Sequence, residues 1–287
     1  MDKATSGWLN GFIGVVVFAG SLPATRVAVS DFDPVFLTCA RATIAALLGS
    51  VLLATGRQRR PTPAELPSLA LVALGVVVGF PLLTALAVQQ VSSAHAMVFV
   101  GLLPLCTAVF GALRAGERPG AAFWSFAVAG GVLVAGYALQ ARAGASPLGD
   151  GLMVAAIVVC GLGYAEGGRL ARTLGGWQVI SWALALSLPV MLPLSGATMP
   201  VSLRHVGVPA WLGLAYVSLF SMLLGFVFWY RGLAQGGIAA VGQLQLLQPF
   251  LGFGLAALLL HEAVDSTMLV VTLGAVACVA GAKKFAA

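Results

Sequence analysis

Long runs of apolar residues, each about as long as a bilayer is thick, constrain the fold of this chain more than any other feature. Residues 34–55 contain one charged side chain and residues 176–196 contain none. A helix of about 20 such residues spans the hydrocarbon core, where backbone polar groups must bond within the protein. The runs are continuously apolar, without the alternation of barrel strands. The sequence therefore predicts an all-α membrane protein.

Ten segments qualify as membrane spans, and the short breaks between them hold most of the proline, glycine and charge. No break is long enough for a soluble domain. The predicted spans are approximately residues 8–25, 34–55, 66–88, 94–113, 119–139, 149–171, 176–196, 209–231, 239–260 and 265–284.

Composition excludes several other classes of protein. The 287 residues are 60% hydrophobic and 8% charged, whereas soluble domains carry about 25% charged residues. The four cysteines stand singly in apolar runs, so neither a disulfide framework nor a metal site is expected. No catalytic cluster and no cofactor motif is present. The net charge of +6 lies at segment ends, which indicates membrane orientation and not nucleic-acid binding.

The distribution of lysine and arginine predicts that both termini are cytoplasmic, in the cell's inner (plasma) membrane. With that orientation eleven cations lie inside and three outside, and Arg41 lies within a span. The inner cations are Lys3, Arg57, Arg59, Arg60, Arg114, Arg118, Arg169, Arg172, Arg231, Lys283 and Lys284, and the outer ones are Arg26, Arg142 and Arg204.

The chain also repeats itself. With a shift of 145 residues, Pro104 meets Pro249 and Glu117 meets Glu262. Each half then holds five spans, and an odd number makes the second half enter the membrane from the opposite side. We therefore expect two inverted five-helix repeats, residues 1–142 and 143–287, with a cavity between them.

These features resemble the EamA-type members of the drug/metabolite transporter superfamily. The residues that carry the resemblance are Ala94, Pro104, Glu117, Ala239, Pro249 and Glu262, together with Arg41 in the second span. Within the superfamily the chain is most similar to YddG-type exporters of aromatic and neutral amino acids. The resemblance implies export of such metabolites by alternating access.

Four prolines inside spans are candidate hinges: Pro104, Pro249, Pro23 and Pro81. Proline leaves the carbonyl four residues earlier without its helical partner. That carbonyl either finds a neighbour in a packed kink or faces a cavity. Broken mid-span helices are where transporters place substrates.

Two glutamines share one face of the ninth span, and their mates in the fourth span are apolar. Gln245 and Gln248 either bond between helices or contact the substrate. The other candidate substrate contacts are Tyr164, Phe99, His95, Trp229, Tyr216 and Ser21.

Charged residues near the spans leave alternatives open. Glu166 is a hypothetical proton-coupling residue, with Arg169 near enough to pair with it. Arg41 pairs with a carbonyl or Asp33, or binds a substrate carboxylate. Glu117 and Glu262 are expected at the membrane surface, each facing the positive end of the next helix. Pro119 is a plausible first residue of the helix that follows Glu117.

The predicted function is secondary transport of a small molecule across the bilayer. A proton-coupled multidrug or other metabolite transporter is the alternative, and a channel is disfavoured by the internal repeat. An intramembrane enzyme would need a nucleophile–base cluster that the spans lack, and no ATP-binding loop is present. Glycine-rich faces serve internal and external packing alike, so the sequence leaves the oligomeric state open.

Overall fold

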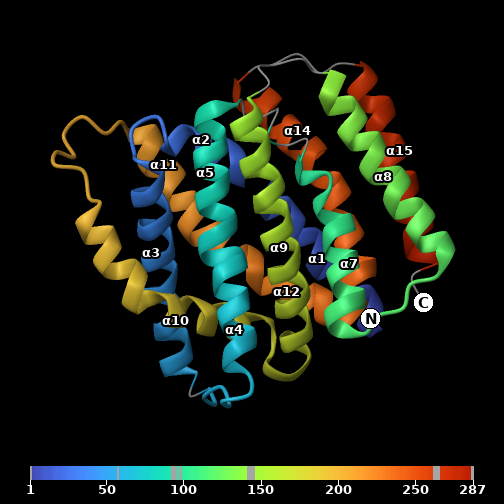
Figure 1. Cartoon of the computed structure of the whole chain (residues 1–287), viewed down its shortest axis with the longest axis horizontal. Helices are drawn as coiled ribbons and strands as arrows, with labels where there is room; N and C mark the ends of the chain where they lie inside the picture. Colours follow the sequence, from blue (N-terminus) through green and yellow to red (C-terminus); the bar gives the residue numbers. More distant parts are fainter. Residues whose placement is uncertain are drawn as a thin grey trace.

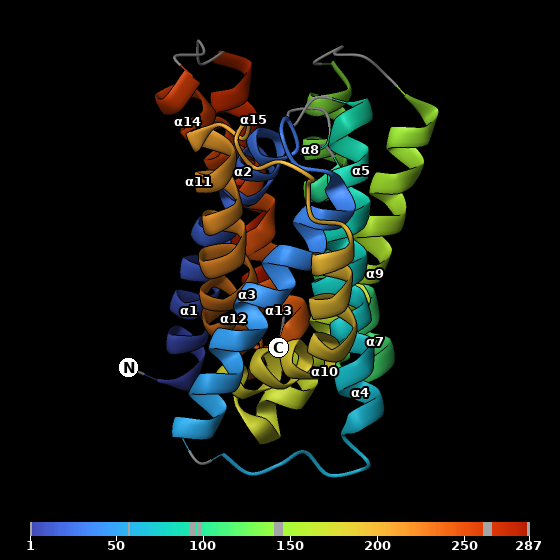
Figure 2. The ribbon, with the colours of Figure 1, turned by 90° about the vertical axis from the view of Figure 1, so that its left-hand side faces the viewer.

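The apolar runs fold as helices that stand side by side (Figures 1 and 2). The computed structural model describes residues 2–56, 58–91, 96, 99–140, 146–260 and 266–285. Every regular element among these residues is a helix. The described N-terminal and C-terminal segments meet at one end of the molecule, where Lys283 Nζ lies 4.8 Å from the centroid of the Trp8 ring.

The helices follow the predicted order. The first half contains α1 (Lys3–Ala19), α2 (Ser21–Ala28), α3 (Pro34–Thr55), α4 (Leu66–Val72), the π-helix η1 (Ala73–Gly79), α5 (Phe80–Gln90), α7 (Leu103–Ala115) and α8 (Ala121–Gln140). The second half contains α9 (Pro147–Leu174), α10 (Gly176–Ala197), α11 (Val208–Tyr216), the π-helix η2 (Val217–Leu224), α12 (Gly225–Gly236), α13 (Ile238–Gly242), the 3-10 helix η3 (Gln243–Leu247), α14 (Gln248–Leu260) and α15 (Ser266–Lys284).

The helices identify a membrane protein. Within the described residues, 6 helical stretches are long and apolar enough to cross a bilayer, and Leu103–Ala115 and Ala121–Leu133 are shorter apolar helices. Several spans are built from pieces, since α1 and α2 together make one stretch, Lys3–Ala28. The all-α class is confirmed, and the count of ten spans stays a prediction.

Large apolar side chains point outward along the helices. Leu74 is 63% exposed, Leu113 73% and Leu212 65%. Such a surface is unfavourable in water but suits contact with lipid chains. The outward faces therefore agree with the bilayer environment inferred from the spans.

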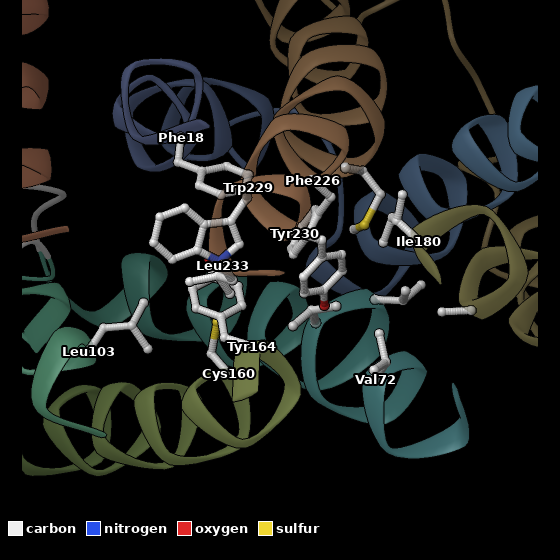
Figure 3. Close-up of a cluster of buried hydrophobic side chains, with 14 of the residues drawn as sticks. Phe18, Val72, Leu103, Cys160, Tyr164, Ile180, Phe226, Trp229, Tyr230 and Leu233 are labelled. Carbon is white, nitrogen blue, oxygen red and sulfur yellow. The ribbon is translucent and has the colours of Figure 1, made fainter. Parts of the chain in front are cut away.

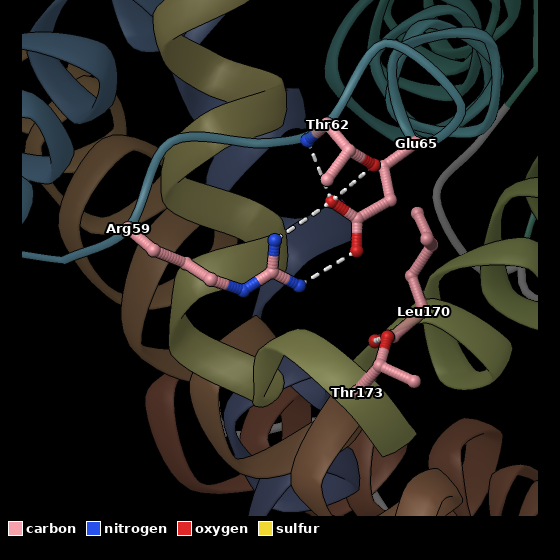
Figure 4. Close-up of polar contacts among 5 residues, drawn as sticks. All are labelled: Arg59, Thr62, Glu65, Leu170 and Thr173. Carbon is pink, nitrogen blue, oxygen red and sulfur yellow. Dashed lines mark hydrogen bonds and ion pairs between the residues drawn. The ribbon is translucent and has the colours of Figure 1, made fainter.

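The connection between α3 and α4 is fixed by an ion pair (Figure 4). Arg59 Nη2 lies 2.7 Å from Glu65 Oε1, and the Thr62 amide donates to Glu65 Oε2 at 2.8 Å. The hydrogen bonds from Arg59, and next those from Thr62, lower the pKa of Glu65 to about 2. This loop therefore keeps its ion pair throughout the neutral pH range.

Helices α1 and α12 approach so closely that only glycine fits between them. A Cβ on Gly232 would lie 2.6 Å from the Gly11 amide nitrogen, and a Cβ on Gly7 would lie 2.5 Å from that of Gly236. Each helix thus presents a glycine pair four residues apart, the spacing that brings helix backbones together in lipid. This contact joins the first span to the eighth.

Substitution of Gly232 by alanine tests this contact. The added methyl group must push α1 away, so we expect the free energy of unfolding to fall by about 1–3 kcal/mol. The measurement is the thermal unfolding midpoint of the purified protein in detergent. The control is Gly151→Ala in α9, where an added Cβ meets nothing within 4 Å. Equal effects of the two substitutions would contradict close packing at Gly232.

Candidate substrate cavity

A small cavity lies at the centre of the helices and is lined from both halves of the chain. Its remaining volume is about 20 Å³, roughly the room that one water molecule needs. In this conformation the cavity is therefore too small to hold a metabolite. The cavity is lined by Phe18, Ser21, Leu22, Thr25, Arg41, Val76, Phe80, Pro81, Thr84, Leu103, Tyr164, Ser221, Phe226 and Gln248.

A larger depression elsewhere is a weaker candidate. It has a volume of about 300 Å³ and lies between α3 and α10, with Gln58, Arg60 and Trp182 in its wall. All of its lining residues belong to these two helices and the loop after α3. A transporter site must be reached from both sides of the membrane, so the central cavity fits better.

The first span breaks at Gly20, between α1 and α2, beside the cavity. There Tyr216 Oη donates to the Val17 carbonyl at 2.8 Å, and Gln248 Nε2 donates to the Phe18 carbonyl at 3.4 Å. Both donors come from the second half of the chain. Neighbouring side chains thus satisfy the carbonyl groups at the break near Pro23. Tyr216, a predicted substrate contact, is not among the residues that line the cavity, and it supports the cavity from behind through Val17.

The mid-span breaks before Pro104 and Pro249 are present. Residues 101–102 form a turn before α7, and η3 interrupts the ninth span before α14. Gln248 N–H donates to the Gln245 carbonyl, which is the carbonyl that Pro249 leaves without its helical partner. The 3-10 turn therefore supplies the missing hydrogen bond.

Two π-helical segments were missed by the sequence reasoning. η1 precedes Pro81, whose missing N–H gives a local reason for irregular bonding. η2 has no proline, yet it occupies the same place in the second half when the chain is shifted by 145 residues. π-Helical turns are frequent at functional sites, and here η1 contributes Val76 and η2 contributes Ser221 to the cavity.

One wall of the cavity carries hydroxyl groups and a cation. Arg41 Nη2 donates to Ser221 Oγ at 3.1 Å, and the Ser21 and Ser221 hydroxyl oxygens are 2.7 Å apart. The predicted pairing of Arg41 with Asp33 is wrong. Asp33 Oδ1 instead accepts from the Val35 amide at 2.8 Å and so caps the start of α3. Arg41 therefore bonds to the second half of the chain.

The cavity lining also includes aromatic side chains, among them Phe18, Tyr164 and Phe226 (Figure 3). Tyr164, which lines the cavity, packs its ring 5.3 Å from Trp229 and 5.8 Å from Phe226. Trp229 is fully buried and does not line the cavity. Here its ring packs against Phe18 and Tyr164, and its role as a substrate contact stays a prediction.

The remaining predicted contacts have different positions. Gln245 is fully buried beside Tyr164, and its amide nitrogen and oxygen have no well-formed hydrogen bond. Phe99 is partly buried against the core and is not among the lining residues. His95, Ala94 and Glu262 lie outside the described residues. Ser21, Gln248, Tyr164 and Pro81 do line the cavity.

Glu166 is held by two arginines, away from the cavity. Its predicted partner Arg169 lies 2.6 Å away, and Arg114 of α7 lies 3.1 Å away. Arg169 also donates to Ser68 of α4 at 2.8 Å. The carboxylate itself is fully buried. The group therefore ties α4, α7 and α9 together.

Glu117 caps a helix, although not the one expected. Its carboxylate accepts from the Ile238 amide at 2.9 Å and the Ala239 amide at 2.7 Å, and it pairs with Arg172. It thus closes the start of α13 in the other half, whereas α8 begins at Ala121, beyond Pro119. Gly237, at φ +90°, makes the tight turn that presents these amides, a conformation that other residues rarely adopt.

Substitution of Glu117 by glutamine tests this cap. One amide of α13 and Arg172 lose their charged acceptor, so we expect a loss of about 1–2 kcal/mol in unfolding free energy. Glu65→Gln is the control, because Glu65 has a similar side-chain exposure, 16% against 17%, but bonds only within its loop. The measurement is the thermal unfolding midpoint of each variant. Equal shifts would contradict a role of Glu117 in joining α13 to the first half of the chain.

Comparison with known proteins now adds the family. A model described as the EamA-like transporter family matches residues 5–139 and again residues 147–282. The chain belongs to the EamA-like transporter family. The resemblance found in the sequence is confirmed, and the chain is a membrane transporter with two EamA domains.

Relatives of this EamA-like transporter extend the comparison. It is 66% identical over 286 residues to "Uncharacterized transporter YdeK" of Bacillus subtilis (strain 168), with 100% of both chains covered. It is 25% identical to "Probable terminal-alkyne amino-acid exporter" of Streptantibioticus cattleyicolor, with 82% of this chain and 79% of that protein covered. A solved structure titled "Crystal structure of protein" matches with a TM-score of 0.78 at 20% identity, covering 96% of this chain and 98% of the other. That likeness concerns the fold.

Proposed function

We propose that this EamA-like transporter exports small amino-acid-like metabolites, aromatic or neutral, from the cytoplasm by alternating access. The observation that carries the proposal is the central cavity, whose lining combines hydroxyl groups and a cation with aromatic side chains. A free amino acid with an apolar side chain likewise combines polar and apolar parts. The distant relative named as an amino-acid exporter supports this substrate class.

The two inverted repeats, residues 1–142 and 143–287, supply the mechanism in this proposal. Several cavity residues are mates under the shifts between the halves. Val76 corresponds to Ser221 and Leu103 to Gln248 at 145 residues, and Ser21 corresponds to Tyr164 at 143. A site formed by mated positions lies near the pseudo-symmetry axis, where inverted repeats place substrates. Each repeat then adopts in turn the conformation that the other has just left, and the site opens to one side of the membrane at a time.

Gln248 is the proposed contact for the substrate's amine. The Phe18 carbonyl can only accept, so the amide nitrogen of Gln248 faces it. The amide oxygen, which has no hydrogen-bond partner, is left to accept from an ammonium group. The hydrogen bond to the exposed Phe18 carbonyl at the helix break thus fixes the orientation of the Gln248 side chain.

Counterflow in proteoliposomes tests the function. Liposomes loaded with unlabelled L-phenylalanine or L-leucine should accumulate the labelled amino acid transiently and saturably. Non-saturable flux would indicate a channel, and exchange of cationic drugs alone would favour the multidrug alternative. Either result would contradict amino-acid export.

The matched variants in this assay are Gln248→Leu and Gln243→Leu. Loss of the amine contact should raise the half-saturation concentration roughly tenfold, the effect of one hydrogen bond to a charged group. Gln243 is equally buried but donates within its own segment, to the Ala239 carbonyl, so its variant should resemble the wild type. Equal effects would show that Gln248 contributes stability alone.

We also propose that the Glu166 network closes the cytoplasmic side. Opening inward then requires separation of Arg114, Glu166 and Ser68, which belong to three helices. Glu166→Gln weakens these contacts, so we expect a changed exchange rate with the dependence on pH unchanged. The measurement is counterflow and pH-gradient-driven uptake in the same liposomes.

The proton-coupling hypothesis for Glu166 predicts the opposite pair of results. Gradient-driven uptake would disappear while counterflow remained normal. The control is Glu65→Gln, which removes a carboxylate from the same side of the membrane outside the network.

A further inference from the structure

We infer that Arg41 is the binding site for a carboxylate group of the substrate, with the hydroxyls of Ser21 and Ser221 beside it. This inference rests on the proposed function and deepens it, because it assigns the charge that the site recognises. No other described residue that lines the cavity is ionised at neutral pH.

Arg41 is a buried cation without an anionic partner. The residue is 5% exposed, and it lies seven residues inside α3, about 10 Å along the helix axis from its start. The carboxylates of the described ion pairs, Glu65, Glu117 and Glu166, bind other arginines. A charged side chain in a span is costly and marks a substrate or ion pathway. Arg41 thus needs a function that offsets its cost.

The hydrogen bonds around Arg41 leave donors in excess. Arginine only donates, and its Nε has no partner among the described residues. Ser221 Oγ accepts from Arg41 and is bonded to Ser21. Whichever serine donates to the other, one hydroxyl hydrogen of the pair is left over. A group of surplus donors around a cation is complementary to an anion with several acceptor positions, such as a carboxylate.

Arg41 has no charged counterpart at the matching position of the second repeat. Its mate on α10 is Leu184 under the shift of 143 residues and Leu186 under the shift of 145, and neither leucine lines the cavity. The corresponding place in the other half therefore contains neither a charge nor a cavity contact. A cation that is required for the fold of each repeat would have a counterpart in the other repeat. A cation that binds one end of a ligand needs no counterpart.

The rest of the cavity fits a ligand held by its carboxylate. Gln248 offers an acceptor for an amine, while Phe18, Phe80, Tyr164 and Phe226 surround an apolar side chain. The site therefore distinguishes a zwitterionic or anionic substrate from its neutral amide or ester. A bare amine satisfies only the Gln248 end.

The test compares an acid with its amide on one protein. Ligand-induced thermal stabilisation of the purified transporter is titrated with L-phenylalanine, L-phenylalaninamide and 3-phenylpropionate, and the same compounds compete in counterflow. We expect the wild type to bind the acid at least tenfold more tightly than the amide. In Arg41→Gln the affinity for both acids should fall about tenfold to a hundredfold, while that for the amide stays unchanged.

Two further variants keep the test decisive. Arg41→Lys retains the charge but loses the planar fork, so the ratio of the affinities for acid and amide should fall only several-fold. This variant replaces Arg41→Gln in the test if Arg41→Gln does not fold. Arg26→Gln is the matched control, because Arg26 donates to the Val88 carbonyl and does not line the cavity. Its acid-to-amide ratio should equal that of the wild type.

The outcomes separate this inference from the proposed function. Amino-acid counterflow with an unchanged acid-to-amide ratio in the Arg41 variants overturns the role of Arg41 and leaves export standing. Arg41-dependent binding of both acids without amino-acid counterflow supports Arg41 and overturns amino-acid export. A wild type that binds none of the carboxylates overturns the inference.

Discussion

The hydrogen bonds that close the helix breaks are the contacts on which this structure depends. Inside a bilayer no water can satisfy a carbonyl that a broken helix exposes. At the first span this is done by Tyr216 and Gln248, whose side chains reach Val17 and Phe18 from the second half. The hydrogen bonds that satisfy the exposed carbonyl groups in lipid therefore also hold the two halves together beside the cavity.

In the proposed function, a different kind of contact closes the cytoplasmic side. Glu117 and Glu166 connect α7, α9, α13 and α4 through charged hydrogen bonds. Interhelical hydrogen bonds in membranes contribute about 0.6 kcal/mol each on average, so a few of them can close one side without locking it. A transporter needs such closure, because each side must open in turn with a small free-energy difference between states. The tight glycine contact of α1 with α12 has no such freedom and holds these two helices, one from each half, together.

The sequence predicted what depends on neighbours along the chain. The spans, the start of α3 at Asp33 and Pro34, the breaks before Pro104 and Pro249, and the Glu166–Arg169 pair all follow from local patterns.

It failed where the answer depends on which helices meet. Glu117 caps a helix more than a hundred residues away, and Arg41 bonds to Ser221. The π-helix η2 has no local signal at all, and only its repeat mate η1, which precedes Pro81, could have suggested it.

The chemistry of the cavity departs from the symmetry of the repeat in a consistent way. At mated positions that line it, the first half offers Val76 and Leu103 where the second offers Ser221 and Gln248. In the proposed alternating access, the backbone symmetry allows the site to open to either side, which requires two similar scaffolds. Recognition has the opposite need, because an amphipathic ligand has one polar end and one apolar end. Different side chains at mated positions meet both needs. Arg41 is the strongest case of that division, because its mate under either shift is a leucine outside the cavity lining.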